Sequence, residues 1–313
     1  MATRPDVLLI GPLIPHAMAQ LEAAYVVHRY DLAPSRDALV AELAPRLSAI
    51  ATRGDYPLPG ALLRQLPGVK LVASSGVGYD GVDIAAARAL GIAVTNSAGG
   101  ASECVADTTL ALILATVRRT VCNDRYVRAG GWLRAPAPLT DKVWGERLGI
   151  IGLGSIGRAI ARRAEGFRMD IAYHGRRPQP DVAYRYYASP VELARDVKIL
   201  VVAIPGGSAT RGFVSREVID ALGPGGYLVN ISRGSNVDEP YLVDALVNGR
   251  LAGAGLDVFA REPHVPEALF ALDNVVLQPH VGSGSQATRD ALGQFVVDNL
   301  AAFFAGRPLL TPV

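Results

Sequence analysis

The stretch "RLGIIGLGSIG", from Arg147 to Gly157, sets an apolar run directly before three spaced glycines. The apolar run is typical of a short buried strand, and the residues that follow, "RAIARRAEGF", are typical of a helix. Strand, glycine turn and helix in this order form the context in which G-x-G-x-x-G indicates a dinucleotide-binding fold. We therefore predict a parallel α/β sheet that begins at this strand.

The three glycines of this turn have separate physical tasks. The first permits a tight turn, the second lets the backbone approach a pyrophosphate, and the third lets the helix pack near the strand. The free N–H groups at the helix N-terminus then face the phosphates. Cofactor contacts are predicted at Gly152, Leu153, Gly154, Ser155, Ile156 and Gly157. The alternatives are a glycine-rich turn without a ligand and the similar turn of a methyltransferase.

Apolar runs alternate with helical patterns along most of the chain. Before the glycine turn, the runs typical of strands are "DVLLIG", "YVVHRYD", "LSAIATRG", "VKLVASSG" and "IAVTNS". After it, the second array continues with "MDIAYHG", "VKILVVAIP", "GGYLVNIS", "GAGLDVF" and "NVVLQPH". This alternation predicts the α/β class with two doubly wound parallel sheets. Residues 102–128 are expected to form one apolar helix, and residues 286–304 a last helix that returns to the first domain.

The composition excludes several classes of function. A chain of 313 residues is long enough for two domains. Its 31 basic and 29 acidic residues are mixed along the sequence, so we expect neither nucleic-acid nor membrane-surface binding. The two cysteines, Cys104 and Cys122, lack metal-ligand spacing, and no metal site or disulfide framework is expected. The N-terminus has no signal-peptide core, so the predicted location is the cytoplasm.

The end of the second strand of the later array bears on the choice between NAD and NADP. In an NAD site an acid at this point bonds the ribose 2'-hydroxyl. Asp170 stands at the entry of the strand instead, and we interpret it as a surface acid. The carboxyl end carries His174, Gly175, Arg176 and Arg177, and guanidinium groups suit a 2'-phosphate. We predict that NADP(H) is preferred over NAD(H); the alternatives are a solvated basic turn and NADH-dependent chemistry.

Three later strand ends carry polar residues that suit one reaction site. Arg233 lies in "LVNISRGSNVDE", Glu262 follows "GAGLDVF", and His280 lies in "VVLQPHVGSGS". Because the carboxyl ends of parallel strands meet at one edge of the sheet, we expect these side chains to meet in one crevice. Taken singly, a strand-end histidine is more often a structural group with satisfied hydrogen bonds, and a Glu-Pro pair is often only the start of a loop.

These motifs, together with "VKLVASSGVGYDGVD" and "VTNSAGGASECVADTTLALIL", resemble the D-2-hydroxyacid dehydrogenase family, in particular its glyoxylate/hydroxypyruvate reductase branch. The resemblance extends over nearly the whole chain. It implies a flavodoxin-like substrate-binding domain of residues 1–96 and 285–313, with a Rossmann NAD(P)-binding domain of residues 97–284 inserted in it. An active site in the cleft between the domains is also implied. The implied homodimer uses the region of residues 102–128, although a buried intramolecular helix explains the same residues.

The resemblance also implies a role for each candidate residue. Arg233 would bind the carboxylate and carbonyl of a 2-keto acid, and His280 would protonate the carbonyl oxygen as hydride arrives from NADPH. Glu262 would orient the imidazole and favour its charged form, and the N–H groups of Val77 and Gly78 would face the substrate carboxylate. Further cofactor contacts are implied at Ile204, Pro205, Thr210, Ile231, Ser232, Asp257 and Gly282.

Several alternatives stay open from the sequence. Asp257 could instead cap the turn that follows it, and Gly76 and Gly78 could serve only their own turn. No residue of "GGWLRAPAPLTDKVWG" or "GALLRQLPG" distinguishes glyoxylate, hydroxypyruvate, a 2-ketoaldonate or hydroxyphenylpyruvate as the acceptor. A protein of another class, a dinucleotide sensor such as the co-repressor C-terminal binding protein, would bind cofactor with little turnover.

Overall fold

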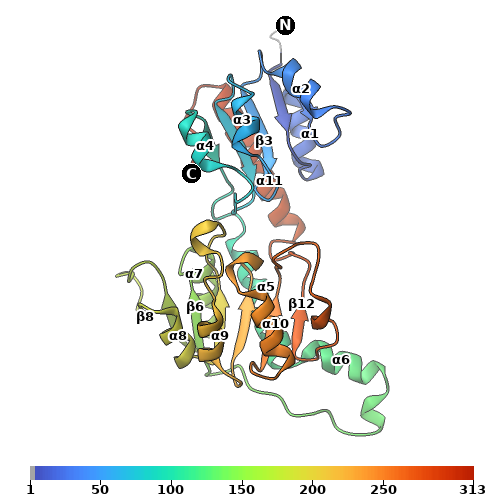
Figure 1. Ribbon diagram of the computed structural model, residues 1–313, viewed down its shortest axis with the longest axis vertical. Coiled ribbons are helices and arrows are strands. Elements are labelled where there is room, and N and C mark those ends of the chain that lie inside the picture. The colour runs from blue at the N-terminus through green and yellow to red at the C-terminus, as the bar shows by residue number, and fades with distance from the viewer. Residues whose placement is uncertain (1–3) are drawn as a thin grey trace. The chain divides into compact units, whose positions relative to one another are not determined.

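The computed structural model describes residues 4–313 and divides them into two compact units. The residues up to Ala101 form the first unit together with Ser285–Val313, and Ser102–Gly284 form the second. The domain boundary predicted after residue 96 lies a few residues before this division. Both units contain parallel sheets with helices between most successive strands (Figure 1), which confirms the predicted α/β class.

The first unit is built on a five-stranded parallel sheet in the order β2-β1-β3-β4-β5. This is the flavodoxin-like strand order. Strands β1, β3 and β4 are buried on both faces, as parallel strands covered by helices require. The elements are β1 (Asp6–Leu9), α1 (Pro15–Ala24), β2 (Val26–Arg29), α2 (Arg36–Leu43), β3 (Ala49–Arg53), α3 (Gly60–Arg64), β4 (Leu71–Ser75), α4 (Ile84–Ala89), β5 (Ala93–Thr95) and α11 (Gln286–Phe304).

The last helix of the chain completes the first unit. Helix α11 packs against β4, and its Val296 and Leu300 belong to the same buried cluster as Val7 and Leu9 of β1. The Ser285 side chain accepts a hydrogen bond from the Thr288 N–H and caps the helix N-terminus. The helix predicted over residues 286–304 is therefore confirmed, and it belongs to the first unit.

The second unit has a seven-stranded parallel sheet in the order β12-β11-β10-β9-β6-β7-β8. This is the Rossmann order with one further strand at the β12 edge, and the order reverses between β6 and β9. Ligands bind such sheets at the carboxyl ends of the strands beside this switch point. The strands are β6 (Arg147–Ile151), β7 (Asp170–His174), β8 (Arg185–Tyr187), β9 (Ile199–Val202), β10 (Tyr227–Asn230), β11 (Gly253–Leu256) and β12 (Val275–Leu277). The helices are α5 (Ser102–Val117), α6 (Thr120–Arg128), η1 (Gly131–Leu133), α7 (Ser155–Gly166), α8 (Pro190–Asp196), η2 (Ser208–Thr210), α9 (Arg216–Leu222), η3 (Gly234–Asn236), α10 (Glu239–Val247) and η4 (Glu267–Leu269).

Strand β8 was not predicted from the sequence. It has three residues, too few for alternation to be recognised, and it pairs with β7 at the sheet edge. The Tyr186 hydroxyl donates to the Gly175 carbonyl at 3.2 Å, and its ring lies 5.5 Å from the ring of Tyr173. Tyr186 of this strand thus packs within the second unit.

The segment predicted as one apolar helix over residues 102–128 is two helices. The chain turns at Arg119, whose φ of 51° is left-handed, so α5 ends at Val117 and α6 begins at Thr120. Helix α5 is largely buried, whereas α6 has no buried residue. We call residues 120–144 the arm, because Figure 1 shows this segment looping away from the sheet of the second unit. Its exposed apolar side chains are Val121, Val127, Trp132, Leu133, Leu139 and Trp144.

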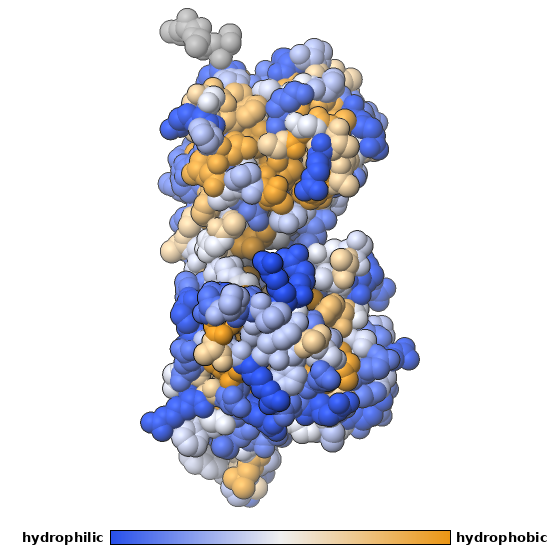
Figure 2. Space-filling view, turned by 90° about the vertical axis from the view of Figure 1, so that its left-hand side faces the viewer, coloured by the Kyte–Doolittle hydropathy of each residue, from blue (hydrophilic) through white to orange (hydrophobic). Residues whose placement is uncertain are grey.

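Between residues 4 and 313 no helix has the length and apolar character needed to span a lipid bilayer. On the face of the second unit seen in Figure 2, hydrophilic residues predominate and apolar residues reach the surface in small separate areas.

Candidate active site

The glycine turn between β6 and α7 uses its three glycines differently. Gly152 has a φ of 97°, and a Cβ there would lie 2.6 Å from the Ala203 carbonyl oxygen. A Cβ on Gly157 would lie 2.2 Å from the Gly152 carbonyl oxygen. A Cβ on Gly154 would meet no atom within 4 Å, so the backbone there borders open space. The first and third glycines are required by the turn and by packing, and the second leaves room for a ligand.

Helix α7 begins at this open space. Gly154 is its N-cap residue and supplies no side-chain hydrogen bond, so the N–H groups of the first turn have no side-chain cap. These groups belong to Ser155, Ile156 and Gly157, and together with the helix dipole they favour an anion. The geometry therefore fits the pyrophosphate of a dinucleotide.

The end of β7 presents two arginines. Asp170 lies exposed at the start of the strand, and His174 lies at its end, where Nδ1 donates to the Tyr187 carbonyl at 3.0 Å. Arg176 and Arg177 are both exposed, and within residues 4–313 neither makes a hydrogen bond or an ion pair. Two guanidinium groups thus stand unpaired at the carboxyl end of β7.

Gln179 holds the arginine-bearing loop against the glycine turn, and sequence reasoning missed it. Its N–H donates to the Tyr173 hydroxyl at 2.7 Å, and its Nε2 donates to the Leu153 carbonyl at 2.9 Å. Arg158 of α7 donates to the side chains of Gln179 and Asp181. Two of these partners are a tyrosine hydroxyl and a backbone carbonyl, so no sequence motif could have indicated this role.

Buried amides shape the turn that carries Arg233 after β10. The Asn230 Oδ1 accepts from the N–H and hydroxyl of Ser232, and its Nδ2 donates to the Arg233 carbonyl at 2.9 Å. The Asn236 Nδ2 donates to the Ser232 hydroxyl at 3.0 Å and to the Ile204 carbonyl at 3.2 Å. The chain after β9 and the chain after β10 are thereby fixed side by side.

Other predicted cofactor contacts lie on these same segments. Ile231 is buried next to Ser232, directly after β10. Thr210 donates through its hydroxyl to the Pro205 carbonyl at 2.7 Å, so the loop after β9 is closed on itself. The predicted contacts after β6, β7, β9 and β10 thus all lie at the carboxyl edge of one sheet.

His280 and Glu262 form a pair at the same edge. The imidazole Nδ1 lies 2.7 Å from Glu262 Oε2, and Glu262 Oε1 accepts from the Phe259 N–H at 3.0 Å. Burial raises the pKa of Glu262, but the hydrogen bonds from His280 and Phe259 and the charges of His280 and Arg233 outweigh it and lower that pKa. A Cβ on Gly234, the residue after Arg233, would lie 1.9 Å from the Phe259 carbonyl carbon, so the Arg233 turn packs against the segment that leads to Glu262.

The pair defines which imidazole nitrogen can react. An ionised carboxylate only accepts hydrogen bonds, so we assign the proton facing Glu262 to Nδ1 of His280. The Nε2 atom makes no hydrogen bond to any residue in the described part of the chain. The side chains of His280 and Glu262 are 38% and 34% exposed, so the pair is partly open to solvent.

Asp257 fixes the backbone of His280. His280 has a left-handed φ of 54°, a conformation that costs roughly 1–2 kcal/mol for most residues. Its N–H donates to the Asp257 carbonyl, and the two carboxylate oxygens of Asp257 accept from the N–H groups of Val281 and Gly282, all at 2.8 Å. A Cβ on Gly282 would lie 2.8 Å from Asp257 Oδ2. Asp257 thus caps the turn that carries His280, which is not the turn directly after Asp257 that the sequence left as an alternative.

We expect Asp257→Asn to lower kcat by about 10-fold, because the amide keeps one acceptor and the His280 turn loosens. Burial raises the pKa of Asp257, so a neutral side chain also relieves the cost of a buried charge. The melting temperature should therefore change by less than about 4 °C. Steady-state kinetics and thermal denaturation test this, with Asp273→Asn as the exposed control. Weakened cofactor binding at an unchanged kcat would instead assign Asp257 to the cofactor.

In the first unit, the loop after β4 offers two backbone donors. Gly76 has a φ of 112°, and its N–H donates to the Ser97 hydroxyl at 3.2 Å. The Val77 carbonyl accepts from Asn96 Nδ2 at 2.8 Å. The N–H groups of Val77 and Gly78 donate to no group within residues 4–313. The loop is held by the hydrogen bonds of the Gly76 N–H and the Val77 carbonyl. The N–H groups of Val77 and Gly78 remain available to bind a ligand.

Comparison with known families decides the class of this site. Residues 110–282 match the model of the D-isomer specific 2-hydroxyacid dehydrogenase, NAD binding domain. The chain belongs to the D-isomer specific 2-hydroxyacid dehydrogenase family. It is therefore an oxidoreductase that uses a nicotinamide dinucleotide, and the matched residues lie within the second unit.

Relatives within this dehydrogenase family are similar over almost the whole chain. Hydroxyphenylpyruvate reductase of Plectranthus scutellarioides is 47% identical, and glyoxylate/hydroxypyruvate reductase A of Arabidopsis thaliana is 46% identical; each alignment covers 98% of both chains. The crystal structure of NADPH-dependent glyoxylate/hydroxypyruvate reductase from Sinorhizobium meliloti, in complex with NADP and malonate, has a TM-score of 0.92 at 42% identity. That comparison covers 99% of this chain and 97% of the other.

Proposed function

We propose that the protein reduces a small 2-keto acid to the D-2-hydroxy acid with NADPH. The observation that carries this proposal is the His280–Glu262 pair, held 2.7 Å apart at the carboxyl edge of a Rossmann sheet, with the Arg233 turn packed against the segment that leads to Glu262. An acid, its orienting carboxylate and an anion-binding arginine are the groups that carbonyl reduction requires. The names of the similar reductases support the same reaction.

Each residue of this group has a defined task in the proposed reaction. The Arg233 guanidinium binds the carboxylate and polarises the carbonyl of the substrate. The bound nicotinamide supplies the hydride. His280 gives its Nε2 proton to the carbonyl oxygen, and Glu262 stabilises the imidazolium and fixes the ring through Nδ1. The N–H groups of Val77 and Gly78 are proposed as further donors to the substrate carboxylate.

The preference for NADPH is proposed from the two unpaired arginines after β7. A 2'-phosphate carries negative charge that Arg176 and Arg177 can bind through charge-assisted hydrogen bonds. No carboxylate stands at the end of β7 to bond a ribose 2'-hydroxyl; the acid of this strand, Asp170, lies at its start. The NADP complex of the similar Sinorhizobium meliloti enzyme is consistent with this assignment.

The test is the oxidation rate of NADPH and NADH, measured side by side at pH 7. The acceptors are glyoxylate, hydroxypyruvate, 2-ketogluconate and hydroxyphenylpyruvate, and chiral analysis identifies the product. We expect turnover with at least one acceptor, a D-configured product and a higher rate with NADPH. Tight cofactor binding without turnover on any acceptor would contradict the reductase proposal and favour a dinucleotide sensor.

We further propose that the protein is a homodimer joined through the arm. Large apolar side chains are seldom this exposed on a monomer: Leu133 and Leu139 are 93% and 99% exposed. Most residues of α5 are buried within its own unit and cannot contact a partner. The proposed contact therefore lies on the arm that follows this helix. Sedimentation analysis should give a dimer for the wild type and a monomer for Leu133→Glu with Leu139→Glu. Leu32→Glu, at an exposed position of the first unit, should leave the dimer intact.

The proposed compartment is the cytoplasm. Cys122 is a free cysteine, and reducing compartments keep thiols in this state. Fractionation of cells that produce a tagged chain would test this location.

A further inference from the structure

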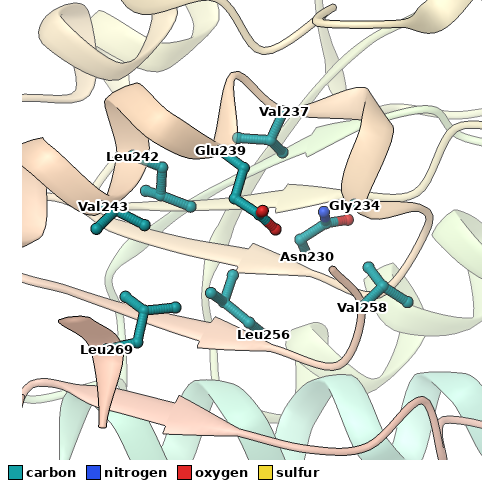
Figure 3. A pocket seen from close by; sticks show the side chains of 9 residues that line it. All are labelled: Asn230, Gly234, Val237, Glu239, Leu242, Val243, Leu256, Val258 and Leu269. Carbon is teal, nitrogen blue, oxygen red and sulfur yellow. The ribbon is translucent and has the colours of Figure 1, made fainter. Parts of the chain in front are cut away.

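An acidic side chain, Glu239, lies in an otherwise mostly apolar pocket beside the segment from Phe259 to Glu262. Figure 3 shows the Glu239 carboxylate pointing into a space lined by Leu242, Val243, Leu256 and Leu269. The residues that line the pocket lie on or directly beside β10, η3, α10, β11 and η4. Glu239 is partly buried there, and hydrogen bonds from neighbouring backbone can satisfy its carboxylate.

The carboxylate of Glu239 is engaged by the chain that carries Glu262. Its Oε2 accepts from the Ala260 N–H at 2.8 Å. The preceding N–H, that of Phe259, donates to Glu262 Oε1 at 3.0 Å, and Glu262 Oε2 contacts His280 Nδ1 at 2.7 Å. Two successive backbone N–H groups thus bind two carboxylates, one from α10 and one from the catalytic pair.

A second contact ties the Arg233 turn to the same loop. A Cβ on Gly234 would lie 1.9 Å from the Phe259 carbonyl carbon and 2.2 Å from the Ala260 nitrogen. The backbone after Arg233 therefore rests directly on the segment that Glu239 holds. A shift of the Ala260 backbone would therefore displace the backbone that holds Glu262. It would also displace the surface against which the Arg233 turn packs.

We propose that Glu239 is a positioning residue that aligns the Glu262–His280 pair through the N–H of Ala260. It contacts neither imidazole nor substrate, and it acts by fixing the loop from Phe259 to Glu262. This inference rests on the proposed reductase function, in which Glu262 orients the proton donor. Its effect should therefore appear in kcat and should depend on Glu262.

The test compares two replacements of Glu239. Glu239→Met fits the apolar pocket and removes the acceptor, whereas Glu239→Gln keeps an acceptor oxygen for the Ala260 N–H. We expect Glu239→Met to lower kcat about 10-fold with KM and NADPH affinity unchanged, and Glu239→Gln to restore kcat to within about 2-fold of wild type. Glu217→Met is the control, because Glu217 is also a first-turn carboxylate, on α9, that does not contact this loop.

A double-mutant cycle separates positioning from general structural damage. In a Glu262→Gln background, adding Glu239→Met should lower kcat by less than about 2-fold, because the two residues act in sequence. An equal loss in both backgrounds, or an unchanged kcat in Glu239→Met alone, overturns the inference. Should Glu239→Met fail to fold, Glu239→Ala enters the same cycle with the same expected outcomes.

A readout independent of turnover distinguishes failure of this inference from failure of the proposed function. Absence of wild-type turnover contradicts the proposed function alone. The imidazole N–H proton resonance of His280 still reports its bond to Glu262, and Glu239→Met should move that resonance upfield relative to wild type. An unchanged resonance overturns the positioning role whether or not the wild type turns over.

Discussion

Replacement of His280 by asparagine should lower kcat for 2-keto acid reduction by about 100-fold to 10,000-fold, the usual contribution of a positioned general acid. Asparagine tolerates the left-handed φ of 54° at this position, so the turn held by Asp257 is retained while the ionisable nitrogen is lost. Steady-state rates at saturating NADPH give kcat, and fluorescence titration gives cofactor affinity, which should change little.

The control for this variant is His264→Asn. His264 is exposed, and we assign it no part in the reaction. Its replacement should leave kcat within about 2-fold of wild type, the range of surface substitutions. If His280→Asn kept most of the wild-type rate, proton donation would have to be assigned to another group.

The second large effect is expected for the double variant Arg176→Ala, Arg177→Ala. Each charge-assisted hydrogen bond to a 2'-phosphate contributes about 1.5–3 kcal/mol. Loss of both groups should therefore lower kcat/KM for NADPH by roughly 100-fold to 10,000-fold, while kcat/KM for NADH stays within about 3-fold. Because both guanidinium groups lack partners within residues 4–313, their removal breaks no internal hydrogen bond or ion pair.

Two further variants test this cofactor prediction. Lysines at both positions keep the charge but lose the bidentate geometry, and an intermediate loss is expected. Arg88 is exposed on α4 of the first unit, far from β7 along the chain. Its replacement, Arg88→Ala, removes a positive charge and should leave kcat/KM for NADPH and kcat/KM for NADH unchanged. Equal losses with NADPH and NADH in the double alanine variant would show that these arginines do not distinguish the cofactors.

The helices and strands could be predicted from the sequence wherever their own residues carry the apolar pattern of the element. The buried strands and α11 were predicted because apolar runs and helical periodicity are local signals. Strand β8 was missed because its three residues carry no periodicity of their own. The break between α5 and α6 was missed because it depends on a single left-handed residue, Arg119, in a helix-forming context.

The site could be predicted only where a residue type indicates its chemistry. A histidine and an acid after strand ends pointed to His280 and Glu262, which the structure places 2.7 Å apart. Asn230, Gln179 and Glu239 were not recognised, because all three bind backbone groups. Such groups have no signature in the sequence, and their partners are known only once the strands lie side by side.

The late position of α11 in the chain has a consequence for biosynthesis. Val296 and Leu300 cover an apolar face formed by residues such as Leu9 and Leu71, yet the whole of Ser102–Gly284 is translated before them. At about 5–20 residues per second, the ribosome needs on the order of 10–40 s to translate Ser102–Gly284, and α11 is synthesised only after that. During that interval the nascent first unit exposes the face, so we expect chaperones to bind there until translation ends.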